Sequence, residues 1–148
     1  MDLHLRGKRA LVTGSTRGIG RAIASALLDE GASVAICGRD AAGVEHAVKS
    51  LGEKGKVVGA PVDVANGEAL GAWVADSAAA LGGLDIVVSN VSAGGGGRTS
   101  IEAWRQNFEV DMLGTVHTVE AALPFLEKSQ AGAITMISST AAVEAFRA

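Results

Sequence analysis

The chain has 148 residues, of which 48% are hydrophobic and 20% are charged, and its net charge is −3. This length and composition are typical of one globular domain, spanning residues 1–148, that buries about 70% of its unfolded surface. The weak negative charge gives no reason to expect a nucleic acid or a membrane surface as a partner. Because Met1–His4 contains no apolar signal segment and no apolar run approaches about 20 residues, we expect a cytoplasmic protein.

Short apolar runs alternate with longer segments whose apolar residues recur at helical spacing, which predicts alternating strands and helices. The strands are expected at Lys8–Val12, Ser33–Cys37, Val57–Val62, Leu84–Ser89 and Ala133–Ser138. The helices are expected at Gly18–Glu30, Ala41–Leu51 and Gly67–Leu81, followed by one of about 25 residues after the Gly94–Gly97 loop. Because the strands lack strict polar alternation, this order predicts an α/β fold, a doubly wound parallel sheet with helices on both faces.

The last and longest predicted helix carries its own start and stop signals. Thr99 and Glu102 have the spacing of a capping box, and Pro124 should kink or shorten the last turn. Trp73 and Trp104 lie on apolar helical stripes, which favours packing in the core over stacking on a substrate. The stripe of the long helix consists of Ile101, Trp104, Phe108, Met112, Val116, Val119 and Leu123.

A glycine-rich turn, Thr13–Gly20, lies between the first predicted strand and the first helix. Its glycines, Gly14, Gly18 and Gly20, follow the spacing G-x3-G-x-G. Unpaired N–H groups and the positive end of the helix dipole make the start of a helix an anion site. Glycine lets the backbone close on a pyrophosphate. An ordinary tight turn is the alternative, but the strand–turn–helix context favours a dinucleotide site.

The remaining chemically active residues point to no metal or thiol chemistry. Cys37 is the only cysteine, so no internal disulfide can form, and its place at the end of an apolar strand favours a small buried hydrophobe. His4, His46 and His117 lack the spacing of a metal site. We therefore expect no metal.

Four motifs occur in the order typical of short-chain dehydrogenases/reductases. The chain resembles the N-terminal part of such a protein, most of all the 3-oxoacyl-carrier-protein-reductase-like branch. This resemblance implies a Rossmann-type fold with its C-terminal strands missing, and hydride transfer between a nicotinamide and a carbonyl or alcohol substrate. The motifs are Thr13–Gly20, Asp63-Val64, Leu84–Asn90 and Ile137–Ser139.

The same resemblance implies the cofactor site. NAD-preferring members carry an acid at the end of the second strand, where this chain has Gly38 followed by Arg39. Arg39 and Arg17 could both pair with a 2′-phosphate, so NADP(H) is favoured over NAD(H), although Asp40 could weaken this effect. Asp63 and Val64 resemble the adenine contact, with Asp63 alternatively a helix cap. The implied cofactor-binding residues are Gly14, Ser15, Thr16, Arg17, Gly18, Ile19, Gly20, Arg39, Asp63, Val64 and Asn90.

The catalytic residues are only partly present. Ser139 matches the serine that holds the substrate oxygen, and Asp111 stands where the family has an asparagine that anchors a water. The chain contains no tyrosine, so the proton-transferring tyrosine and its lysine partner should lie a little beyond Ala148. Ser89, Val91 and Ser92 also depart from the family pattern around Asn90.

Three interpretations follow. The first is an NADP(H)-dependent oxidoreductase whose chain is truncated and therefore inactive alone. The second is a catalytically inactive dinucleotide-binding module or scaffold, which Asp111 and the altered segment Ser89–Ser92 favour slightly. The third is a folding unit that pairs with another copy through the last strand or the long helix, and a homo-oligomer, a dimer or a tetramer, is expected.

Overall fold

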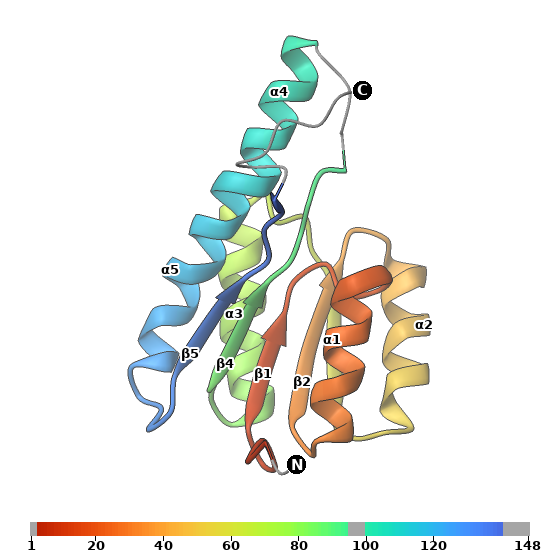
Figure 1. The fold of residues 1–148 in the computed structure, drawn as a ribbon, viewed down its shortest axis with the longest axis vertical. Helices are drawn as coiled ribbons and strands as arrows, with labels where there is room; N and C mark the ends of the chain where they lie inside the picture. Colours follow the sequence, from red (N-terminus) through yellow and green to blue (C-terminus); the bar gives the residue numbers. More distant parts are fainter. Residues whose placement is uncertain (1–2, 95–99, 141–148) are drawn as a thin grey trace.

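The computed structural model describes residues 3–94 and 100–140, whose strands form one parallel five-stranded sheet in the order β3-β2-β1-β4-β5 (Figure 1). The predicted Rossmann-type α/β fold is confirmed. The strands are β1 (Arg9–Val12), β2 (Ser33–Gly38), β3 (Val57–Pro61), β4 (Ile86–Ser89) and β5 (Ala133–Met136). The helices are α1 (Gly18–Asp29), α2 (Ala41–Gly52), α3 (Gly67–Leu81), α4 (Ile101–Asn107), the π-helical segment η1 (Phe108–Leu113) and α5 (Gly114–Leu126).

Helices cover both faces of the sheet, and each face has its own core (Figure 1). In β1, Leu11 packs toward α3 and α5, whereas its neighbours Ala10 and Val12 pack toward α1 and α2. All three are fully buried. Because successive side chains of a strand point to opposite faces, a strand covered on both sides must be apolar throughout, which explains the missing alternation in the sequence.

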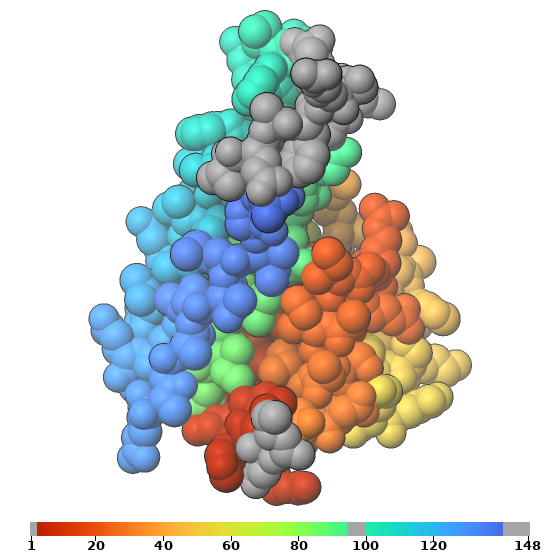
Figure 2. Space-filling model, in the orientation of Figure 1, coloured from red at the N-terminus to blue at the C-terminus, as the bar shows by residue number. Residues whose placement is uncertain are grey.

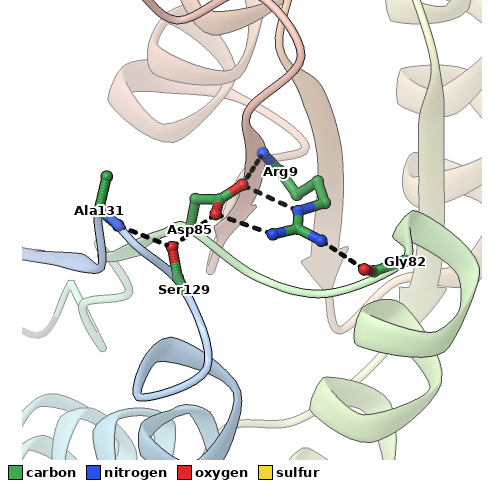
Figure 3. A network of polar contacts seen from close by, with 5 residues as sticks. All are labelled: Arg9, Gly82, Asp85, Ser129 and Ala131. Carbon is green, nitrogen blue, oxygen red and sulfur yellow. Dashed lines mark hydrogen bonds and ion pairs between the residues drawn. The ribbon is translucent and has the colours of Figure 1, made fainter.

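A polar network fastens the amino ends of β1 and β4 to the segments around them (Figure 3). The Asp85 carboxylate accepts hydrogen bonds from Arg9 Nε and Nη2 at 2.8 Å each and from the Arg9 backbone N–H at 2.9 Å. Ser129 Oγ donates to the same carboxylate at 2.6 Å, and Arg9 Nη1 donates to the Gly82 carbonyl at the end of α3. Only 7% of the Asp85 side chain is exposed.

The prediction that Trp104 packs in the core is wrong, although Trp73 is buried as expected. Trp104 is 66% exposed, and the stripe on which it lies faces outward with it. The buried face of the long helix carries small residues, among them Gly114, Thr118 and Ala122. A Cβ on Gly114 would lie 2.8 Å from Val64 Cγ2, so close approach to the segment before α3 selects the small face rather than the bulky one.

The start of this helix also differs from the prediction. Ser100 is the N-cap, and its side chain accepts a hydrogen bond from Ala103 N at 3.2 Å; the predicted cap, Thr99, lies outside the described residues. At the other end, α5 continues through Pro124 and ends two residues later, at Leu126. A proline removes one backbone donor, and here the following turn still forms, with Glu127 N bonded to Leu123 O.

The last strand of the sheet is exposed. All four residues of β5 are exposed, and Met136 keeps 61% of its surface accessible. Figure 2 shows β5, in dark blue, on the surface of the molecule. Within the described residues, β5 pairs only with β4, so its other edge and one of its faces are available for contact.

Among residues 3–94 and 100–140, none of the helices has both the length and the apolar character needed to cross a membrane.

Candidate functional site: a dinucleotide groove

A groove of about 440 Å³ opens at the carboxyl ends of β1, β2, β3 and β4. In open α/β sheets this edge, beside the strand where the winding reverses, is where ligands bind. The strand order places that reversal at β1 and β4. Nine of the eleven predicted cofactor-binding residues line the groove, namely Gly14, Thr16, Arg17, Gly18, Ile19, Arg39, Asp63, Val64 and Asn90.

Backbone conformation or close packing favours glycine at each of the three positions of the turn. Gly14 and Gly18 have φ values of +60° and +58°, which favour glycine over any residue with a side chain. Gly20 has no such φ value, but a Cβ on it would lie 2.4 Å from the Gly14 carbonyl oxygen. The turn therefore presents bare backbone at the start of α1, as a pyrophosphate site needs.

Asn90, at the end of β4, braces this turn from the side. Its Nδ2 donates to the carbonyl oxygens of Thr13 at 3.2 Å and Gly14 at 3.1 Å, and its backbone N–H donates to Thr13 Oγ1 at 3.0 Å. Thr13 is fully buried and was not among the predicted site residues. Its position between an apolar strand and a glycine turn carries no signal that distinguishes it from a core residue.

Ser15 faces the strands rather than the groove. It is fully buried, and its Oγ donates to the Val12 carbonyl at 2.6 Å and accepts from Cys37 N at 3.2 Å. The Ser15 N–H in turn donates to the Cys37 carbonyl at 2.9 Å. Ser15 thus connects the turn to β2 through hydrogen bonds. Gly20 packs against the turn, where the absence of a side chain leaves room for the Gly14 carbonyl oxygen. Cys37 is buried as expected, and this burial raises the pKa of its thiol to about 12.

Two guanidinium groups lie at the end of the groove near β2. Arg17 and Arg39 are exposed and line the groove, and neither forms a salt bridge within the described residues. The carboxylate of Asp40, beside Arg39, is engaged elsewhere, because its Oδ2 accepts from Gly43 N at 2.7 Å as the N-cap of α2. The two cations are therefore available to an anionic ligand.

Asp63 and Val64 follow β3 on the opposite wall of the groove. Asp63 is exposed, and its Oδ1 accepts from Ala65 N at 3.1 Å in a local turn. The alternative that Asp63 caps the next helix is wrong, because Asn66 is the N-cap of α3 and accepts from Ala69 N. Val64 is 4% exposed and offers an apolar surface at the groove.

Of the two predicted catalytic residues, neither lines the groove. Asp111 lies in η1, and its Oδ1 accepts from Ala93 N at 2.6 Å, which ties the helix to a groove wall. Its carbonyl oxygen accepts from Thr115 Oγ1 at 2.7 Å, and that hydroxyl accepts in turn from Ser89 Oγ at 3.1 Å. Ser139 follows β5 and is exposed. No sequence signal points to the role of Thr115, because a threonine inside a helix has no pattern that distinguishes a polar contact from ordinary packing.

In the part of the chain that the structure describes, no group of three or more His, Cys, Asp or Glu side chains has the geometry to hold a metal ion.

A glycine-lined groove at the carboxyl edge of a doubly wound parallel sheet defines a dinucleotide-binding protein of the Rossmann class. The model of the short chain dehydrogenase family matches residues 8–148, so this chain belongs to that family.

The chain is similar to oxidoreductases with varied substrates. It is 36% identical to an isoepoxydon dehydrogenase of Penicillium expansum, over 97% of this chain and 56% of the relative. It is 37% identical to L-fucose dehydrogenase of Mus musculus, over 93% of this chain and 50% of that protein. The chain thus spans about half the length of these curated relatives.

Solved structures with the same fold hold either nicotinamide cofactor. L-sorbose reductase from Gluconobacter frateurii, in complex with NADPH and L-sorbose, is 33% identical with a TM-score of 0.85 over 92% of this chain and 54% of that one. A 7α-hydroxysteroid dehydrogenase in complex with NADH is 30% identical with a TM-score of 0.90 over 98% of this chain and 58% of that one.

Proposed function

We propose that this chain is the dinucleotide-binding part of an NADP(H)-dependent oxidoreductase that acts on a small carbonyl or alcohol substrate in the cytoplasm. The observation that carries the cofactor assignment is the pair Arg17 and Arg39, both on the groove, beside a residue at position 38 that has no side chain. Similarity to the 3-oxoacyl-carrier-protein-reductase-like branch is part of the proposal.

Different residues of the chain would bind different parts of the dinucleotide. The N–H groups at the start of α1 hold the pyrophosphate, the two arginines hold the 2′-phosphate, and Val64 and Asp63 receive the adenine. When bound, NADP(H) supplies or accepts the hydride. Ser139 would hold the substrate oxygen, and Asp111 would fix the groove wall through Ala93.

Replacing Arg39 with alanine is expected to weaken NADPH binding by about 10- to 100-fold, since a hydrogen bond to a charged group contributes roughly 1.5–3 kcal/mol. NADH binding should change little, because NADH carries no 2′-phosphate. Titration of both nucleotides by calorimetry measures the two effects. Lys49→Ala is the control for net charge, since Lys49 is an exposed residue of α2 that does not line the groove. Equal losses for NADPH and NADH in Arg39→Ala would contradict a 2′-phosphate contact.

The catalytic half of the proposal depends on a tyrosine, a residue type that this chain does not contain, and on a lysine four residues after that tyrosine. A proton donor positioned at the substrate oxygen contributes about 10²- to 10⁴-fold to such a reaction. We expect a Tyr-x-x-x-Lys motif in frame beyond Ala148, and sequencing of the transcript tests this. If the motif is absent, the inactive dinucleotide-binding module becomes the better proposal, with Asp111 in place of the family asparagine as its supporting observation.

We propose that a second copy of the chain packs against the exposed apolar stripe of the long helix. The helix is about 39 Å long, and its apolar face is uncovered over most of that length. Antiparallel pairing about a two-fold axis near Met112 places Arg105 opposite Glu120 of the second copy, so the charges beside the stripe are complementary.

The charge-introducing variant Phe108→Glu is expected to shift the protein from a dimer or tetramer to a monomer in sedimentation velocity, because Phe108 is 54% exposed near the middle of the stripe. Lys49→Glu introduces a carboxylate on α2 and should leave the mass unchanged. A monomeric wild type would overturn this proposal.

A further inference from the structure

The side chain of Thr16 lies directly against the backbone of Gly38, and both residues line the groove. A Cβ built on Gly38 would lie 2.7 Å from Thr16 Cγ2 and 3.1 Å from Thr16 Oγ1. Real Cβ atoms essentially never show contacts under 3.0 Å. Even alanine at position 38 therefore requires Thr16 or its backbone to move.

The backbone around both residues is fixed by hydrogen bonds. Ser15 N donates to the Cys37 carbonyl at 2.9 Å, and Cys37 N donates to Ser15 Oγ at 3.2 Å. On the other side, Val62 N donates to the Gly38 carbonyl at 2.9 Å. These bonds hold the turn that carries Thr16 and the strand end that carries Gly38 in one position, so the two backbones cannot separate without losing buried hydrogen bonds.

Rotation of the Thr16 side chain eases the contact but does not remove it, because one heavy atom stays within 3.1 Å of the added Cβ. Threonine has two heavy atoms on Cβ, and both face Gly38. Among the three staggered rotamers, each places a heavy atom in at least one of the two positions that lie 2.7 and 3.1 Å from the added Cβ. Serine, with a single heavy atom on Cβ, can turn away from both positions, whereas valine cannot.

We propose that Thr16 is a specificity-determining residue, because its branched side chain excludes any side chain from position 38 and so keeps a carboxylate away from the two arginines of the groove. This proposal rests on the proposed NADP(H) function. Arg17 and Arg39 lie on the groove beside Gly38, and an aspartate there would both pair with them and repel a 2′-phosphate. Thr16 would thus exclude an acidic side chain from position 38 by steric clash, independently of any charge effect.

The steric step is tested without any nucleotide. Gly38→Ala is expected to lower the melting temperature of the wild type by on the order of 5 °C. The same substitution should cost little in a Thr16→Ser background and the full amount in a Thr16→Val background. Unfolding is followed by the fluorescence of buried Trp73. An equal loss in all three backgrounds would overturn the proposal.

The specificity step is tested with NADPH and NADH. Gly38→Asp alone is expected to weaken binding of both nucleotides, because the turn is displaced. The double variant Thr16→Ser/Gly38→Asp should bind NADH at least about tenfold more tightly than Gly38→Asp does, while NADPH binding stays weak because of charge repulsion. A Gly38→Asp variant that already prefers NADH and binds it as tightly as the double variant would overturn the role of Thr16. If the wild type binds neither nucleotide, the proposed function fails, yet the melting temperatures still decide whether Thr16 restricts position 38.

Discussion

Gly20→Ala is expected to weaken NADPH binding by about 10- to 100-fold and to destabilise the fold, since overpacking of a rigid site costs roughly 1–3 kcal/mol. The added Cβ would meet the Gly14 carbonyl oxygen at 2.4 Å and Asn90 Nδ2 at 2.5 Å. Both atoms belong to the brace between β4 and the glycine turn, in which Asn90 Nδ2 donates to Gly14 O at 3.1 Å. The methyl group therefore displaces the backbone that is proposed to hold the pyrophosphate.

Calorimetric titration with NADPH and thermal unfolding measure the two effects of Gly20→Ala. Gly71→Ala is the matched control, because Gly71 lies inside α3 and nothing lies within 4 Å of its added Cβ. That control should bind normally and gain about 0.5–1 kcal/mol of stability, since alanine is a better helix former than glycine. If Gly20→Ala binds NADPH as tightly as the wild type, the glycine turn is not where the pyrophosphate rests.

The fold was predictable because the strands are short apolar runs and the helices between them carry apolar residues at helical spacing. Lys8–Val12 was expected as the first strand and β1 is Arg9–Val12, and α3 has the expected bounds. The error at Trp104 has a physical cause. Periodicity finds an apolar stripe, but it does not say whether the stripe or a face of small residues packs on the sheet. Gly114 decides the matter through its close contact with Val64, which is a tertiary feature.

The candidate site was predictable to the extent that it consists of local motifs. The turn with Gly14 and Gly18 can be found from spacing, and the position of Arg39 follows from the resemblance to the family. By contrast, the hydrogen bonds from Asn90 to Thr13 join residues 77 positions apart. The contact between Thr16 and Gly38 likewise depends on how the turn after β1 meets the end of β2. Such features follow from strand register, which the sequence pattern does not specify to the ångström.

Asp85→Asn is expected to lower the free energy of unfolding at pH 7 by about 1.5–3 kcal/mol, because it removes the buried carboxylate that accepts hydrogen bonds from the partly exposed Arg9 guanidinium. The network joins β1, α3, β4 and the loop before β5, so its loss loosens four segments at once (Figure 3). Asp29→Asn is the control, since the Asp29–Lys54 pair is more than a third exposed on both sides and should contribute about 0–1 kcal/mol.

The pH dependence of this effect gives a sharper test. Hydrogen bonds from the Arg9 guanidinium, above all, hold the pKa of Asp85 well below its usual range, against the opposing effect of burial. A carboxyl group whose pKa is depressed in the folded state stabilises fully above its unfolded pKa of about 3.9, and this stabilisation falls as pH drops toward the folded value. The difference between wild type and Asp85→Asn in urea unfolding should therefore be constant from pH 7 to about pH 5 and shrink below about pH 4. A difference that stays unchanged down to pH 2.5 would mean that packing of the Asp85 side chain, rather than its charge, holds the amino ends of β1 and β4 together.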